Sequence, residues 1–147
     1  MADAELVELP LEACLALLQA NVVGRLCFVA DDWPVAIPVN YRLVQAGTRR
    51  WVAVRTRPGN IIDRAPLKVA FEVDGLDPRR RQGWSVLVRG TLHRVDADAA
   101  GFRERFDPDP WIVAERDSWL IVDPVMITGR ELHGGEPEWP FVSEAYL

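Results

Sequence analysis

The sequence predicts a mainly β fold with short helices, arranged as a small antiparallel barrel. Three observations predict this class: six segments alternate apolar and polar residues, the turns between them are short, and only two or three short stretches have helical spacing. A doubly wound sheet needs a helix between successive strands, and the sequence does not supply one. The chain has 147 residues and no repeat or composition break divides it, so we expect a single domain over residues 1–147.

The first third of the chain predicts one helix and one hairpin. Residues 1–9 are expected to form an N-terminal extension. Residues 10–20 place apolar side chains at helical spacing behind a proline, which the first turn of a helix tolerates. Apolar and polar residues then alternate over 25–30 and 35–41, and Asp31-Asp32 between them is typical of a hairpin turn. We therefore predict a short helix followed by two antiparallel strands.

Three further strands are predicted in the middle of the chain. The segments 51–56, 68–74 and 84–92 alternate apolar and polar residues, the second of them strictly. A proline and a glycine interrupt the pattern after the first segment, where we expect a short helix near residues 60–65. Gly90, inside the last segment, indicates a bend or a bulge.

The last third predicts a helix, a strand and a tail. Residues 96–106 have helical spacing behind a capping aspartate, and two prolines follow them. Residues 119–132 are expected to form the sixth strand, broken or bulged at Pro124. Residues 133–147 form an acidic tail with three aromatic residues.

The charge balance argues against nucleic acid and membrane partners. Asp and Glu number 22 against 17 Lys and Arg, so the formal net charge is -5. The run at residues 79–81 is the densest basic stretch, and without interleaved aromatic residues it is typical of a solvated loop. No segment has a signal peptide's basic start or the roughly 20 apolar residues that span a bilayer. With only two cysteines, the chain is expected in the reducing cytoplasm.

Metal and hydrolytic sites are not expected. The two histidines, His93 and His133, lie far apart, and no Cys-x-x-Cys or His-x-x-x-His pair occurs. The dinucleotide fingerprint and the P-loop are also absent. The catalytic residues, if the protein is an enzyme, are therefore unknown from the residues alone.

The segment from Arg55 to Asn60 is the most informative for binding. Arg55 and Thr56 end a predicted strand, a tight turn follows, and a predicted helix begins near Asn60. Guanidinium, hydroxyl and unpaired amide groups would then converge as they do around bound phosphates. The alternative is that Arg55 pairs with a surface carboxylate and Asn60 only caps the helix.

The order of short motifs resembles the pyridoxamine 5'-phosphate oxidase-like, FMN-binding split-barrel family, most closely its small uncharacterised bacterial members. The resemblance spans residues 9–132 and rests on the intervals between motifs, since no single motif is specific. The motifs are Val-Gly-Arg-Leu at 23–26, Pro-Val-Asn-Tyr at 38–41, Arg-Thr-x-Pro-Gly at 55–59, Ala-Phe-Glu-Val-Asp at 70–74, Gly-Trp-Ser-Val at 83–86 and Thr-Gly-Arg at 128–130.

This resemblance implies a six-stranded antiparallel split β-barrel that forms a homodimer, with FMN in a cleft at the subunit interface. It places Arg55 and Thr56 near the FMN phosphate. The residues that it places beside the isoalloxazine ring are Pro38, Val39, Asn40 and Tyr41. Trp84 and Ser85 are also expected to approach the cofactor, either from the same subunit or from the partner subunit.

One position departs from the family pattern. Relatives often carry a lysine or an arginine two residues after the turn glycine, where this chain has Ile61. Arg57 or Lys68 would have to supply the missing charge, because losing one charge-assisted hydrogen bond to a phosphate costs about 1.5–3 kcal/mol. A deazaflavin coenzyme, haem or no cofactor at all therefore remain alternatives to FMN.

Two functions follow from these expectations. The first is an FMN-dependent oxidoreductase that passes hydride or electrons between a nicotinamide-type donor and a small-molecule acceptor. The second is a non-catalytic homodimeric module that stores or senses a flavin, a deazaflavin or haem, or that has lost its cofactor.

Overall fold

The computed structural model describes residues 3–57, 59, 64–96, 102–111 and 118–134. Its elements, in chain order, are β1 (Glu5–Leu9), α1 (Leu11–Ala20), β2 (Val23–Ala30), β3 (Trp33–Ala46), β4 (Arg49–Thr56), β5 (Leu67–Asp77), β6 (Gln82–Val95), α2 (Phe102–Phe106) and β7 (Ser118–His133). Among the described residues, no helix is both long enough and apolar enough to cross a membrane.

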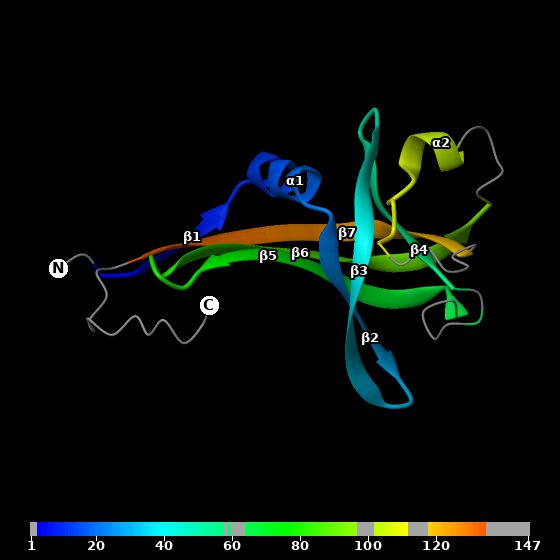
Figure 1. Ribbon diagram of the computed structural model, residues 1–147, viewed down its shortest axis with the longest axis horizontal. Coiled ribbons are helices and arrows are strands. Elements are labelled where there is room, and N and C mark those ends of the chain that lie inside the picture. Colours follow the sequence, from blue (N-terminus) through cyan, green and yellow to red (C-terminus); the bar gives the residue numbers. More distant parts are fainter. Residues whose placement is uncertain (1–2, 58, 60–63, 97–101, 112–117, 135–147) are drawn as a thin grey trace.

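The strands form one antiparallel sheet that closes on itself. Their order is β1-β7-β4-β3-β2-β5-β6, and β6 also pairs with β7, so six strands make a ring and β1 lies outside it. In Figure 1 the β2–β3 hairpin crosses the long strands β5, β6 and β7, and its tip projects beyond them. The predicted six-stranded antiparallel barrel is confirmed, and its geometry is that of a split barrel.

The split lies along one edge of β7. β6 pairs with β7 over almost its whole length, from Trp119 to Leu132. On the other side of β7, β4 pairs only with residues 118–122 and β1 only with residues 129–133. Among the described residues, 123–128 therefore have no strand partner on that side, and α1 lies alongside this part of the sheet (Figure 1).

The core fills the ring and extends to α1. Cys14, Leu15 and Leu18 of α1 are buried in one cluster with the inward-facing side chains of β2 to β7. Within it the Tyr41 and Phe71 rings meet edge to face with 4.8 Å between centroids. The Tyr41 hydroxyl donates a 2.6 Å hydrogen bond to the main-chain oxygen of Leu18, and burial raises the pKa of this phenol. One side chain therefore ties the helix to the barrel.

Two local predictions are confirmed in detail. Asp31 and Asp32 both have positive φ, 51° and 65°, which the two-residue turn of the β2–β3 hairpin requires. Gly90 marks a bulge, since Arg89 pairs with Met126 whereas Gly90 pairs with Pro124, leaving one extra β7 residue between them. A Cβ on Gly90 would overlap the main-chain oxygen of Asp123, so only glycine allows this close approach.

Other boundaries differ from the prediction. Residues 5–9 of the expected N-terminal extension form β1, because β7 offers them an edge to pair with. The expected helix over 96–106 is described only at Phe102–Phe106, and β6 continues to Val95. The short helix near 60–65 falls largely outside the described residues, as do residues 135–147 of the tail.

Candidate functional site

Arg55 lies at the end of β4 and is held on two sides. Its side chain is 18% exposed, and its Nη1 donates to both carboxylate oxygens of Asp107, at 3.0 and 3.1 Å. The guanidinium also stacks on Trp119 of β7, 4.7 Å from the ring centroid, and Arg103 of α2 approaches the same ring at 5.6 Å. These contacts fix a cation at the point where the strand ends.

Thr56, the next residue, is almost fully buried. It is 1% exposed, and its hydroxyl oxygen has no hydrogen-bond partner among the described residues. Ser118, which faces it across the β4–β7 pair, is 4% exposed. A buried hydroxyl without a partner is uncommon, because its desolvation is not repaid, and it indicates a place where another group can bind.

The loop after α2 covers this strand end. Asp107 binds Arg55, and four residues later the main-chain N–H of Trp111 donates a 2.9 Å hydrogen bond to the side-chain oxygen of Asn40. Tyr41 pairs with Val54, so Asn40 and Arg55 are the next residues of the two adjacent strands. The loop thus contacts both Asn40, which is expected near the isoalloxazine ring, and Arg55, which is expected near the phosphate.

The four predicted β3 residues face two directions. Val39 packs against the core and Tyr41 is buried within it. Pro38 is exposed and Asn40 is half-buried. This is the ordinary alternation of a strand, so within one chain Pro38 and Asn40 are the members of this group on the outer face with Arg55.

Trp84 and Ser85 lie at the other end of the barrel. They pair with Glu131 and Arg130 of β7, whereas Arg55 pairs with Trp119 of the same strand. Twelve residues of strand correspond to about 35–40 Å, so a single chain does not bring Trp84 to Arg55. Lys68 is exposed on β5, and Asn60 lies outside the described residues.

Two cavities border the predicted residues. One, of about 390 Å³, lies beside the loop and is lined by Asn21, Tyr41 and Arg42 together with residues 107–109. The other, of about 600 Å³ and mostly apolar, lies between the β2–β3 hairpin and strands β5 to β7, with Lys68 at its wall. No group of three or more His, Cys, Asp or Glu that could hold a metal ion occurs in the described part of the chain.

Sequence reasoning missed the residues that surround Arg55. Asp107 directly follows the helix predicted over 96–106, and Trp119 begins the last predicted strand, so neither is expected beside Arg55. Both residues contact Arg55 although they are far from it in the sequence, 52 residues in the case of Asp107, and no local sequence pattern predicts such a contact. The alternation of apolar and polar residues predicts that Arg55 and Trp119 both lie on strands, and this is the part of their contact that the sequence could predict.

Comparisons with known proteins agree with this fold. The model of the family described as pyridoxamine 5'-phosphate oxidase matches residues 10–131. The uncharacterized protein Rv0080 of Mycobacterium tuberculosis is 33% identical over 129 residues, which cover 85% of this chain and 84% of that protein.

Solved structures show the same barrel. The FAD binding protein of Mycobacterium smegmatis is 30% identical, with a TM-score of 0.64 over 86% of this chain and 98% of that one. An FAD-binding protein of Mesorhizobium loti is 25% identical, with a TM-score of 0.70 over 88% of this chain and 98% of that one. Since the family model spans nearly the whole barrel, the chain belongs to the pyridoxamine 5'-phosphate oxidase family.

Proposed function

We propose that this protein binds a flavin whose phosphate lies against Arg55 and Thr56, with FMN as the flavin, and that it is an oxidoreductase. The observation that carries the proposal is the buried Thr56 hydroxyl, which has no partner among the described residues, next to a half-buried guanidinium. Relatives with 30% and 25% identity are named as FAD-binding proteins, which supports a flavin at this fold's site.

The two side chains fit a phosphate. A guanidinium recognises phosphate oxygens by a fork of N–H donors, and a threonine hydroxyl adds one donor. Arg55 lies on the outer face of β4 and Thr56 on the core face, so the phosphate would lie at the strand end between them. There Thr56 gains the partner it lacks, and Arg55 exchanges the Asp107 carboxylate for the phosphate. Ile61 supplies no charge, so these two residues carry most of the recognition.

The flavin, when bound, supplies two-electron transfer between a nicotinamide-type donor and a small-molecule acceptor. The chain's own residues position it. Pro38 and Asn40 form the outer surface next to Arg55. The Asn40 amide accepts a hydrogen bond from the Trp111 N–H and donates one to the main-chain oxygen of Val22, so it holds the loop in place beside the ring. No side chain of this surface is assigned the role of acid or base.

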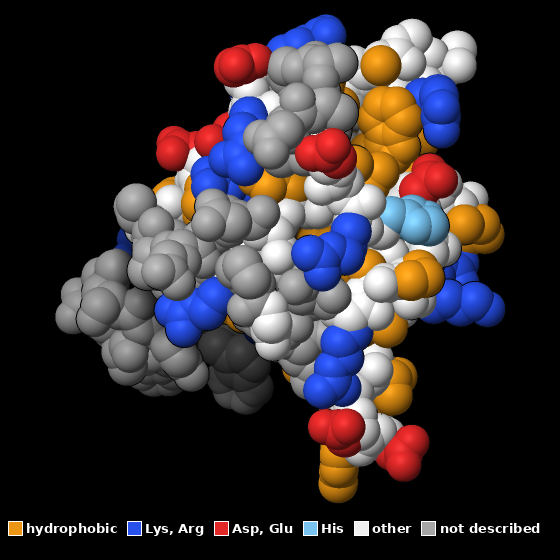
Figure 2. Space-filling model, turned by 90° about the vertical axis from the view of Figure 1, so that its right-hand side faces the viewer, with side chains coloured by type: hydrophobic (Ala, Val, Ile, Leu, Met, Phe, Trp, Pro, Cys, Tyr) orange, Lys and Arg blue, Asp and Glu red, His pale blue; other side chains and the backbone are white. Residues whose placement is uncertain are grey.

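A homodimer completes this site in the proposal. Trp84 and Ser85 lie at the far end of the barrel from Arg55, so only a second copy brings them to the same flavin. The β2–β3 hairpin offers apolar surface for such contact, since Val29 is 66% and Trp33 is 73% exposed. Figure 2, in which this hairpin is the lower tip, shows hydrophobic and acidic side chains together there.

A non-catalytic binding module is the second candidate. The Arg55–Asp107 pair favours the form of this module that has lost its cofactor, because the cation that a phosphate needs already has a carboxylate partner. As a binding module, the protein holds a flavin, a deazaflavin or haem without turning over a substrate, or it holds none.

Titration of the purified full-length protein with FMN, followed by flavin fluorescence, tests the proposal. Arg55→Ala should weaken binding by about ten- to a hundredfold and Thr56→Val by about threefold to tenfold, whereas Arg79→Ala, on an exposed turn, should leave it unchanged. Equal affinity of the Arg55 variant and the wild type refutes the phosphate position.

Parallel titrations with FAD, a deazaflavin and haem identify the cofactor. Binding of one of these in place of FMN replaces the FMN assignment. Reduction of the bound flavin by NADH or NADPH, with reoxidation by an acceptor, then separates the oxidoreductase from the binding module.

A further inference from the structure

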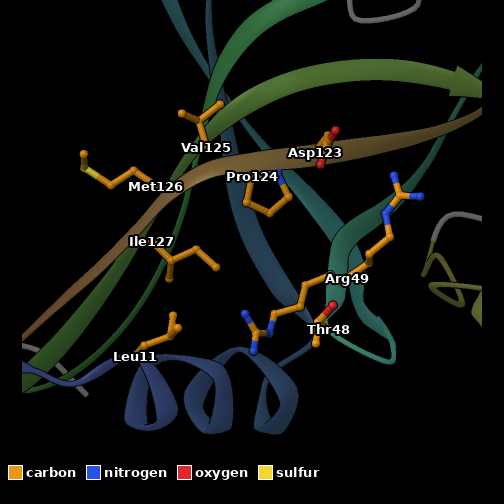
Figure 3. A pocket seen from close by; sticks show the side chains of 9 residues that line it. Leu11, Thr48, Arg49, Asp123, Pro124, Val125, Met126 and Ile127 are labelled. Carbon is orange, nitrogen blue, oxygen red and sulfur yellow. The ribbon is translucent and has the colours of Figure 1, made fainter.

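A cavity distinct from the two described above opens at the split of the barrel, away from Arg55. It has a volume of about 390 Å³ and lies between Leu11 of α1, residues 48–50 where β4 begins, and residues 123–127 of β7. These β7 residues belong to the stretch that pairs with no described strand on this side. In Figure 3 Thr48 faces Pro124 and Ile127 across the opening, and Leu11 borders it from below.

The cavity wall carries cations that the rest of the described chain does not neutralise. Arg49 and Arg50 both line it, and neither forms an ion pair with a described residue; Arg49 stacks on Trp51, 5.0 Å from its ring centroid. The Nε of Arg50 is buried and has no hydrogen-bond partner among the described residues. A buried guanidinium N–H without an acceptor is costly, and no group of the described chain holds the Arg50 guanidinium, so its charge is available to an anion at the cavity wall.

The remaining groups define what fits beside the two cations. Asp123 also lines the cavity, so two positive charges and one negative charge give a net charge of about +1, which suits a monoanion better than a phosphate dianion. The rest of the lining is apolar, and Leu11, Val125 and Met126 are 44%, 82% and 46% exposed. A small ligand with one charged end can cover this apolar surface with its body.

We infer that this cavity binds the carboxylate of a small, mostly apolar organic acid. Arg50 holds the carboxylate, Arg49, on the opposite face of β4, adds its charge at longer range, Thr48 offers a further donor at the cavity wall, and the apolar body lies on Leu11 and the β7 bulge. The site is separate from the proposed flavin position, because Arg50 and Thr56 are six residues apart along β4, about 20 Å of strand. It therefore does not depend on the proposed function.

Sodium benzoate is the probe, titrated into the full-length protein and followed by protein-observed NMR or calorimetry. We expect saturable binding with a dissociation constant of about 0.1–10 mM, the range for a ligand of this size. Benzyl alcohol, which keeps the ring and lacks the charge, should bind at least about tenfold more weakly.

Three variants locate the carboxylate. Arg50→Met, which keeps the length of the side chain, should weaken benzoate binding by about tenfold or more, and Asp123→Asn should strengthen it by about two- to tenfold, because a like charge is removed. Arg79→Met, on an exposed turn, is the matched control and should change nothing. If Arg50→Met does not fold, Asp123→Asn still tests the inference, because it is expected to strengthen benzoate binding, whereas a substitution that damages the fold would weaken it.

Several results overturn the inference. No saturable benzoate binding up to about 50 mM would do so, as would equal binding of benzoate and benzyl alcohol. Arg50-dependent binding of inorganic phosphate in place of benzoate would refute the carboxylate assignment. Weaker benzoate binding by Asp123→Asn would show that Asp123 does not repel the ligand's charge, and would refute a carboxylate bound at this wall.

Discussion

The pair between Arg55 and Asp107 competes with any phosphate that binds at the end of β4. A phosphate that takes the place of the carboxylate at Nη1 must break this pair, so the apparent flavin affinity is lowered by up to the free energy of the pair. Asp107→Asn keeps the shape and one oxygen acceptor but removes the charge. Flavin binding should therefore become tighter in this variant.

The geometry sets the size of the effect. The Arg55 side chain is 18% and the Asp107 side chain 42% exposed, so solvent screens the pair, and its two charge-assisted contacts at 3.0 and 3.1 Å contribute about 0.5–2 kcal/mol. At 1.4 kcal/mol for each factor of ten, Asp107→Asn should lower the dissociation constant for FMN by about two- to thirtyfold.

Fluorescence titration with FMN measures this change, and two further variants interpret it. Asp109→Asn is the matched control, since its side chain lies on the same loop and only its main-chain N–H contacts Asp107. In an Arg55→Ala background the gain should vanish, because no cation is left to release. Weaker binding by Asp107→Asn, or a gain that persists without Arg55, would refute the competition.

Three further predictions concern stability. Tyr41→Phe should lower the free energy of unfolding by about 1–2 kcal/mol in urea titrations, because a buried α1 carbonyl loses its 2.6 Å hydrogen bond; an unchanged value would mean that the bond contributes nothing. Gly90→Ala should cost about 2–4 kcal/mol, since its Cβ overlaps the β7 main chain, and a cost below about 1 kcal/mol would contradict the overlap. Burial, and to a smaller extent the neighbouring Asp74, raises the pKa of Glu72 despite the 3.0 Å hydrogen bond that Arg25 donates to it. The folded state therefore binds the Glu72 proton more tightly than the unfolded state does. The free energy of unfolding consequently falls as the pH rises from the ordinary pKa to the raised pKa. Glu72→Gln should remove that fall, and an identical pH dependence in the variant would contradict it.

Local patterns predicted most of the ring and little of what covers it. The β5 strand could be predicted because its side chains alternate between core and surface, so buried positions are apolar and exposed positions are polar in the sequence. The bulge could be predicted because Gly90 and Pro124 each break a strand rule, and they turn out to be register partners.

The missed features depend on distant partners. β1 has five residues, four of them exposed, so its side chains carry no pattern of burial, and it is a strand only because β7 has a free edge beside it. The bond between Arg55 and Asp107 links residues 52 apart, and the sequence near either residue is compatible with solvent exposure. The motif order indicated the end of β4 as the site, but the carboxylate that occupies it could not be derived from that order.

The pairing of β7 also determines when the chain can fold during its synthesis. β7 is the last described strand, and it supplies partners to β1, β4 and β6. Until the ribosome has released it, hairpins such as β2–β3 and β5–β6 can form, but β1 has nothing to pair with and the ring stays open along two edges. Closure is thus a late event that joins the two ends of the described chain, and the nascent protein must keep those open edges from pairing with other chains until then.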